Sequence, residues 1–265
     1  MSALYNRNTV KPSASTRTKN AFEERRRLPN HELPRFWWLY VPLAFFATRY
    51  AIHLFSDSRN GLESWFRNET GVVENMTVLL LMIALGVAIC TLCRFGKELH
   101  LCPKIFLLLY CLGCIYYAGE EASWGQHWFG WETGDFFRKI NDQQETNFHN
   151  TSVLLDRLPK AIISLLIFIG GIVAPLHYMM RKRRINYQNR LWWLMPTAVC
   201  LPTAVIASIA TLPSKIERAT DLKFYFDQAQ ETKELYIAIF ILLFIISLYV
   251  RMLRLRHAGR HFSPF

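Results

Sequence analysis

Hydrophobic residues in this chain of 265 residues are gathered in long blocks, unlike the alternating or amphipathic patterns of soluble proteins. A helix of about 20 apolar residues crosses the roughly 30 Å hydrocarbon core of a bilayer. Six blocks approach or reach this length, the third being the shortest: Phe36–Phe55, Glu74–Cys93, Ile105–Gly119, Ala161–Met180, Leu191–Leu212 and Leu235–Leu253. The pattern therefore predicts an all-α, polytopic membrane protein with about six transmembrane helices.

The segments outside the blocks divide the chain into three parts. Residues 1–35 are polar and basic, without the apolar core of a cleavable signal peptide, so we expect a disordered tail. Residues 36–253 form the transmembrane domain, in which the first block would also act as the signal anchor. Residues 254–265 form a short basic tail.

The net charge of +11 is distributed unevenly between the two sides of the predicted bundle. Most of the 31 lysine and arginine residues fall in the two tails and in the second-to-third and fourth-to-fifth connections. Cytoplasmic loops of membrane proteins are rich in positive residues. This bias therefore predicts a multi-pass protein of the inner (plasma) membrane with both termini in the cytoplasm. The charge thus reflects topology and contact with membrane lipids, and we expect no nucleic-acid partner.

The six cysteines all lie within or beside apolar blocks, away from the outer loops where disulfides would form. Two Cys-x-x-Cys pairs, Cys90/Cys93 and Cys111/Cys114, have a spacing that suits a metal or redox site. Cysteine also packs as a small apolar residue between helices. The second interpretation is favoured, and the first stays open.

Chemistry is concentrated in the outer segment, residues 119–160, where the third block runs directly into two carboxylates. If residues 120–128 continue as a helix, Glu120, Ser123, Trp124 and His127 share one face, and glycines at 119 and 125 allow a bend. A carboxylate at the end of a membrane helix needs a partner, a proton or a metal.

A second polar group follows at Glu145 and His149, whose i,i+4 spacing would let one helix chelate an ion. Ligands of this type suit a divalent transition metal such as zinc. The candidate catalytic residues are Glu120, Glu121 and Ser123. The candidate metal ligands are Glu121, His127, Glu145 and His149, and the supporting residues are Arg49, Glu74, Trp124, Gln126 and Asn150.

A structural interpretation of the same residues is also open. Glu120 and Glu121 would then pair with Arg49 and Arg138 and hold helices in place. Aromatic residues surround the polar groups: Trp124, Trp128, Phe129, Trp131, Phe136 and Phe137. Aromatic side chains at this depth indicate a re-entrant or interfacial segment.

Three short motifs carry a resemblance to a known group of proteins. They are Gly-Glu-Glu-x-x-Trp-Gly-Gln, Gly-Trp-Glu-Thr and Gln-x-Glu-Thr-Asn-x-His-Asn, all within residues 119–150. This set resembles one in uncharacterised bacterial multi-span inner-membrane proteins, a resemblance that implies no particular reaction. The chain is more distantly similar to the membrane hydrolases that include alkaline ceramidases, which implies zinc held by histidines and a carboxylate. It departs from them in having six blocks rather than seven and no histidine pair in a late block.

Two functions follow from these features. The first is a membrane-embedded, metal- or acid–base-dependent hydrolase or transferase that acts on a lipid or lipid-linked substrate at the outer face. The alternative is a non-catalytic subunit or scaffold that docks a membrane-protein partner or a second copy in envelope assembly, lipid handling or polysaccharide export. A transporter is disfavoured because acids at mid-membrane are almost absent.

Overall fold

The structure is a computed structural model that describes residues 32–55, 71–141, 145–148, 151–181, 191–220 and 229–257. All regular elements in these ranges are helical. In chain order they are η1 (Phe36–Tyr40), α2 (Val41–Phe55), α4 (Val72–Phe95), α5 (Leu101–Glu121), η2 (Ser123–Gly125), α6 (Gln126–Phe129), α7 (Asp135–Ile140), α8 (Val153–Ile167), η4 (Phe168–Val173), α9 (Ala174–Met180), η5 (Trp192–Leu194), η6 (Ala198–Cys200), α10 (Leu201–Ile209), α11 (Leu212–Ala219) and α12 (Ala229–His257).

Five helical stretches are long and apolar enough to cross a membrane: Val72–Phe95, Leu101–Glu121, Arg157–Met180, Trp192–Glu217 and Ala229–His257. They coincide with the last five apolar blocks. Within the described residues they confirm the predicted helical class, and they fit a multi-pass membrane protein. The first block forms η1 and α2, which continue directly into one another over Phe36–Phe55. It carries the charged Arg49 among its apolar residues and is not among the five, so the sixth span stays a prediction.

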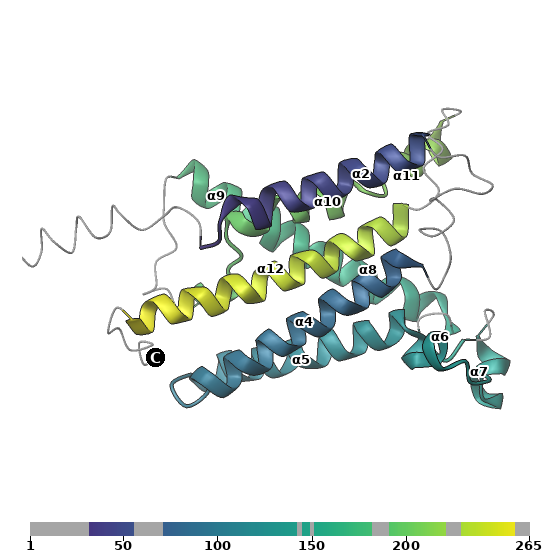
Figure 1. Ribbon diagram of the computed structural model, residues 1–265, viewed down its shortest axis with the longest axis horizontal. Coiled ribbons are helices and arrows are strands. Elements are labelled where there is room, and N and C mark those ends of the chain that lie inside the picture. Colours follow the sequence, from purple (N-terminus) through teal and green to yellow (C-terminus); the bar gives the residue numbers. More distant parts are fainter. Residues whose placement is uncertain are drawn as a thin grey trace, which may run out of the picture.

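The helices run along one long axis of the molecule (Figure 1). The last helix, α12, packs against α4 and α10, and α4 packs in turn against α5. The short helices α6 and α7 gather at one end, and the C-terminal end of α12 lies at the other (Figure 1). This arrangement places the motif segment at the tip of the bundle.

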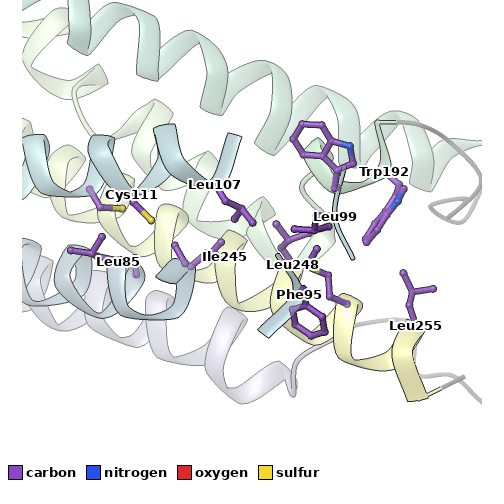
Figure 2. Packing of buried hydrophobic residues seen from close by; sticks show 14 residues of the cluster. Leu85, Phe95, Leu99, Leu107, Cys111, Trp192, Ile245, Leu248 and Leu255 are labelled. Atoms are coloured by element: carbon purple, nitrogen blue, oxygen red, sulfur yellow. The ribbon is translucent and has the colours of Figure 1, made fainter. Parts of the chain in front are cut away.

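The core surrounds α12 because its apolar residues face neighbours on two sides. One cluster joins α12 to α4 and α5, and a second joins it to α10, Trp38 and Ile167. Figure 2 shows the first cluster, where Leu107 and Cys111 of α5 lie near Leu85 of α4 and Ile245 of α12. The buried Cys111 and Cys114 are free thiols in this cluster, as packing residues would be.

The fifth apolar block is broken by its prolines. Pro196 lies in a non-helical stretch between η5 and η6, and Pro202 stands in the first turn of α10, where a missing N–H costs little. Arg251 of α12 donates to two carbonyl oxygens of this broken stretch, Trp192 O at 3.0 Å and Met195 O at 3.1 Å. Trp192 O also accepts the backbone N–H of Met195 at 3.4 Å.

A close helix contact occurs at Gly171, inside the π-helical segment η4. A Cβ atom there would lie 2.6 Å from Ala204 Cβ and 2.6 Å from the Phe240 ring, whereas one at Gly170 would meet only Pro196 Cγ at 3.4 Å. We expect Gly171→Ala to lower the free energy of unfolding by about 1 to 3 kcal/mol through overpacking. Thermal unfolding in detergent beside Gly170→Ala tests this, and equal melting temperatures for the two variants would contradict it.

Candidate functional site

The motif segment leaves α5 through a left-handed backbone turn. The φ angles are 43° at Ser123, 55° at Trp124 and 100° at Gly125. The sequence allowed a break at Gly125, but the two residues before it also turn, so residues 120–128 are not one helix. Positive φ at consecutive non-glycine residues is uncommon and costs about 1 kcal/mol or more at each, so the surrounding contacts must hold the turn in place.

The carboxylate of Glu145 is the centre of these contacts. Its Oε2 accepts hydrogen bonds from Ser123 Oγ at 2.9 Å and from Asn147 Nδ2 at 2.6 Å. Its Oε1 lies 3.2 Å from Nε2 of His127. The left-handed turn therefore brings Ser123 and His127 to one carboxylate that follows them by about 20 residues.

A second set of bonds fixes the position of Glu145. Asn141 Nδ2 donates to the carbonyl oxygen of Glu145 at 2.7 Å and to Oδ1 of Asn147 at 2.8 Å. Gln126 links the two halves of the segment, since its Oε1 accepts from the backbone N–H of Thr146 at 2.7 Å. Ser123 and Asn147 are completely buried, whereas the side chains of His127 and Glu145 are 16% and 13% exposed. His127 and Glu145 are thus the members of the group that solvent can reach.

The two adjacent carboxylates of α5 point to different neighbours. Glu120 accepts from Trp124 Nε1 at 2.9 Å and from the backbone N–H of Phe148 at 2.8 Å, and it is 4% exposed. It therefore ties the turn to the segment that carries Glu145. Glu121 interacts electrostatically with Glu234, Glu74 and Lys160 instead.

Glu121 belongs to a separate polar cluster between the helices, formed with Arg49, Glu74, Lys160, Glu231 and Glu234. In it, Arg49 Nη2 lies 3.4 Å from Glu231 Oε2, and Arg49 Nε donates to Thr232 Oγ1 at 2.8 Å. Lys160 Nζ lies 3.2 Å from Glu234 Oε1. Charges of both signs thus pair across α2, α8 and α12, which supports the structural interpretation for these residues.

The partners predicted for the arginines differ from those observed. Arg49 Nη2 lies 3.4 Å from Glu231 Oε2 of α12, and Arg138 lies 3.6 Å from Glu132 and 3.8 Å from Asp135. Glu132 and Asp135 are close to Arg138 in the sequence and highly exposed, so these pairs stabilise little.

Aromatic side chains form the exterior of the segment. Trp128 Nε1 donates to Asn75 Oδ1 of α4 at 2.8 Å, and Phe129 stacks on Trp131 with ring centroids 5.7 Å apart. Phe129 is 76% exposed. Large exposed aromatic rings, of which Trp128 has its indole N–H hydrogen-bonded, suit the interface between lipid and water.

The predicted metal ligands are only partly brought together. His127 and Glu145 meet, whereas Glu121 lies in the other cluster, and His149 and Asn150 lie outside the described residues. Within the described ranges, no three His, Cys, Asp or Glu residues are arranged to hold a metal ion. The expected helix through Glu145 is wrong as well, because residues 145–148 are not helical.

Asn147 was missed as a site residue by the sequence reasoning, although it completes the contacts of Glu145. The sequence feature that could have indicated Asn147 is its position in the Glu-Thr-Asn motif, where it follows two polar residues and precedes Phe148. Its importance comes from complete burial, because a buried amide must find hydrogen-bond partners.

Comparison of the chain with protein-family models, curated proteins and solved structures found no match.

Proposed function

We propose that this protein is a membrane-embedded hydrolase or transferase that acts on a lipid or lipid-linked substrate at the outer face of the inner membrane. The observation that carries the proposal is the 3.2 Å contact between His127 Nε2 and Glu145 Oε1. A carboxylate beside an imidazole orients the ring and stabilises its protonated form, as general acid–base catalysis requires. Stored backbone strain at the adjacent turn is also typical of functional sites.

In the proposed mechanism His127 moves the proton. Its Nε2 faces Glu145, and Nδ1 has no hydrogen-bond partner among the described residues, so Nδ1 is the atom available to water or substrate. It would take a proton from an attacking water and return it to the leaving oxygen of an ester or phosphoester. Ser123 donates to Glu145 and is completely buried, so we assign it a positioning role rather than that of a nucleophile.

A divalent transition metal such as zinc remains part of the proposal. His127 and Glu145 are the described residues that would hold it, and a third ligand would come from outside the described residues. A bound metal would lower the pKa of a water molecule and so supply the nucleophile. Elemental analysis of the purified protein distinguishes this form of the mechanism from acid–base catalysis alone.

The proposed topology has six spans, with Phe36–Phe55 as the first. The beginning of this helix and the C-terminal end of α12 lie at the same end of the bundle (Figure 1). The positive residues of the tails and of two connections then face the cytoplasm, and the motif segment lies at the outer face as an interfacial or re-entrant element. Exposed aromatic rings such as Phe129 support that depth.

A second candidate is a non-catalytic subunit or scaffold. The complete burial of Ser123 and Asn147 favours it, because a fully satisfied polar network also serves to hold one loop conformation. Exposed aromatic side chains such as Phe129 and Phe136 would then form the surface for a membrane-protein partner or a second copy.

Replacing His127 separates the two candidates. We expect His127→Gln to lower turnover of bilayer phospholipid by about 10²- to 10⁴-fold with an unchanged melting temperature, because only the proton transfer is removed. Full-length protein in liposomes of phosphatidylglycerol and phosphatidylethanolamine, with lipid products measured by mass spectrometry, provides the assay. His177→Gln, in the last turn of α9, is the matched control. Equal turnover in both variants would contradict the proposal, and no turnover by the wild type would favour the scaffold.

A further inference from the structure

A cavity of about 290 Å³ lies between α8, η4, α10, α11 and α12, and the acid–base pair does not contribute to its lining. Its volume is close to the lower end of ligand pockets, about 300 to 1,000 Å³. The walls belong to stretches that are long and apolar enough to cross a membrane. In a membrane the medium around the cavity would be lipid, and Leu165 and Phe168 of its lining are exposed on the surface of the bundle.

The lining changes from charged to apolar along the bundle axis. Lys233 lies one turn from the start of α12, and Ile237 lies one turn further along the helix, about 6 Å deeper by the rise of 1.5 Å per residue. Lys215 belongs to α11, at the end of the apolar stretch Trp192–Glu217. The far end is formed by Ile237, Phe168 and other apolar side chains. A cavity with charged lysines at its opening and apolar side chains in its interior suits an amphipathic ligand.

The two charged side chains in the lining are both lysines. The ammonium group of Lys233 lies near enough to Glu234 to be attracted by its carboxylate, and near enough to Lys215 and Lys160 to be repelled by theirs. Lys160 is paired with Glu234 at 3.2 Å. In the part of the chain that the structure describes, the ammonium group of neither Lys215 nor Lys233 forms a hydrogen bond or a salt bridge. Two unpaired ammonium groups held side by side favour an anion between them.

The hydroxyl groups in the middle of the cavity add no competing donors. Ser164 donates to the carbonyl oxygen of Lys160, and Ser208 donates to that of Ala204 at 2.8 Å. The donors in the described lining that are not used in these bonds are the hydroxyl group of Thr211 and the ammonium groups of the two lysines, which suit a phosphate rather than an amine. Charge, shape and surroundings thus agree on one class of ligand.

We propose that this cavity binds an anionic glycerophospholipid. Its phosphate lies between Lys215 and Lys233, and one acyl chain lies against Phe168 and Ile237. The lipid comes from the membrane leaflet on the side of α6 and α7. Lys233 lies near Glu234, and Glu234 lies near Glu121, the last residue of α5 before the motif segment. The charged end of the cavity is therefore at the same end of the bundle as α6 and α7. The site is independent of the proposed reaction and requires no turnover by His127.

Native mass spectrometry of the full-length protein in detergent tests the proposal with phosphatidylglycerol as the probe. We expect Lys215→Gln combined with Lys233→Gln to reduce phosphatidylglycerol binding at least tenfold. Ser208→Phe, which fills the cavity and leaves the charge unchanged, should reduce binding as much. Lys97→Gln combined with Lys139→Gln removes the same charge elsewhere and should have no effect. Melting temperatures of all variants are measured in parallel to confirm that each is folded.

The comparison ligands separate a lipid from other sources of phosphate. Phosphatidylcholine should bind at least tenfold more weakly than phosphatidylglycerol, and inorganic phosphate at millimolar concentration should not displace the lipid. Undiminished binding by the folded double-lysine variant would overturn the proposal. Loss in that variant without loss in Ser208→Phe would also overturn it, because binding would then be surface electrostatics without the cavity.

Discussion

Replacing Arg251 with alanine is expected to lower the free energy of unfolding by about 3 kcal/mol or more, since a buried charged donor and its bonds are lost together. The side chain of Arg251 is completely buried in α12. Its Nη1 donates to the carbonyl oxygens of Trp192 and Met195, in the stretch broken by Pro196. Without the arginine, the Met195 carbonyl loses this donor, and the Trp192 carbonyl keeps the N–H of Met195 at 3.4 Å. A buried group left unsatisfied costs about 1 to 3 kcal/mol.

The measurement is thermal or denaturant unfolding of the purified protein in detergent, with Arg256→Ala as the control. Arg256 lies on the same helix, but its side chain is 48% exposed and 3.6 Å from Glu98, so its loss should change stability by less than about 1 kcal/mol. Arg251→Lys should fall between the two, because lysine keeps the charge but not the fork that reaches two carbonyls. A similar loss of stability in Arg251→Ala and Arg256→Ala would contradict this role.

Replacing Glu145 with alanine is expected to open the motif segment while leaving the helices intact. Ser123 and Asn147 are fully buried and both donate to Glu145 Oε2, so two donors lose their acceptor. Each orphaned donor costs about 1 to 3 kcal/mol. That sum is comparable to the stability of a local segment, and we expect backbone amides of residues 119–148 to exchange at least tenfold faster.

Hydrogen exchange measured by mass spectrometry resolves this effect from global unfolding. Exchange within α4 and α12 should be unchanged, because their core contacts do not involve Glu145. Glu132→Gln serves as the matched control, since Glu132 belongs to the same segment but its side chain is 94% exposed. Protection of residues 119–148 that survives Glu145→Ala would show that the turn is held by other contacts.

Glu145→Gln asks a different question of the same position. Glutamine keeps the size and one acceptor oxygen, so the segment should stay closer to its native protection than in the alanine variant. It removes the negative charge beside His127, and turnover should fall with it if the proposed mechanism holds. A scaffold, in contrast, would tolerate Glu145→Gln as long as the segment remains folded.

Much of the architecture was predictable because the length of a hydrophobic block is a local property. The thickness of the bilayer sets that length, and five of the six blocks became helices long and apolar enough to span a membrane. The helix over Phe36–Phe55 was also predicted. That it crosses the membrane remains a proposal, because it contains the charged Arg49. Clustering of motif residues beyond α5 marked the end of the bundle where polar contacts are concentrated.

The partners of individual side chains were not predictable, because each depends on contacts between residues distant in the sequence. Spacing placed Glu145 with His149 on a helix, but the left-handed turn at Ser123 and Trp124 brings Glu145 to Ser123 and His127 instead. Adjacent residues on a helix face directions about 100° apart. Consequently Glu120 closes the motif segment, whereas Glu121 joins the interhelical cluster.

The sequence by itself determined the all-helical class, five of its apolar helices and the segment where the motif residues gather, since apolar length and motif composition are local properties of the chain. Only the tertiary structure decided that the carboxylate of Glu145 meets His127. It also decided that Arg251 is buried at a proline break and that two lysines stand over an apolar cavity. These features arise where backbone turns and helix packing bring distant residues within hydrogen-bond distance, and no local pattern encodes that proximity.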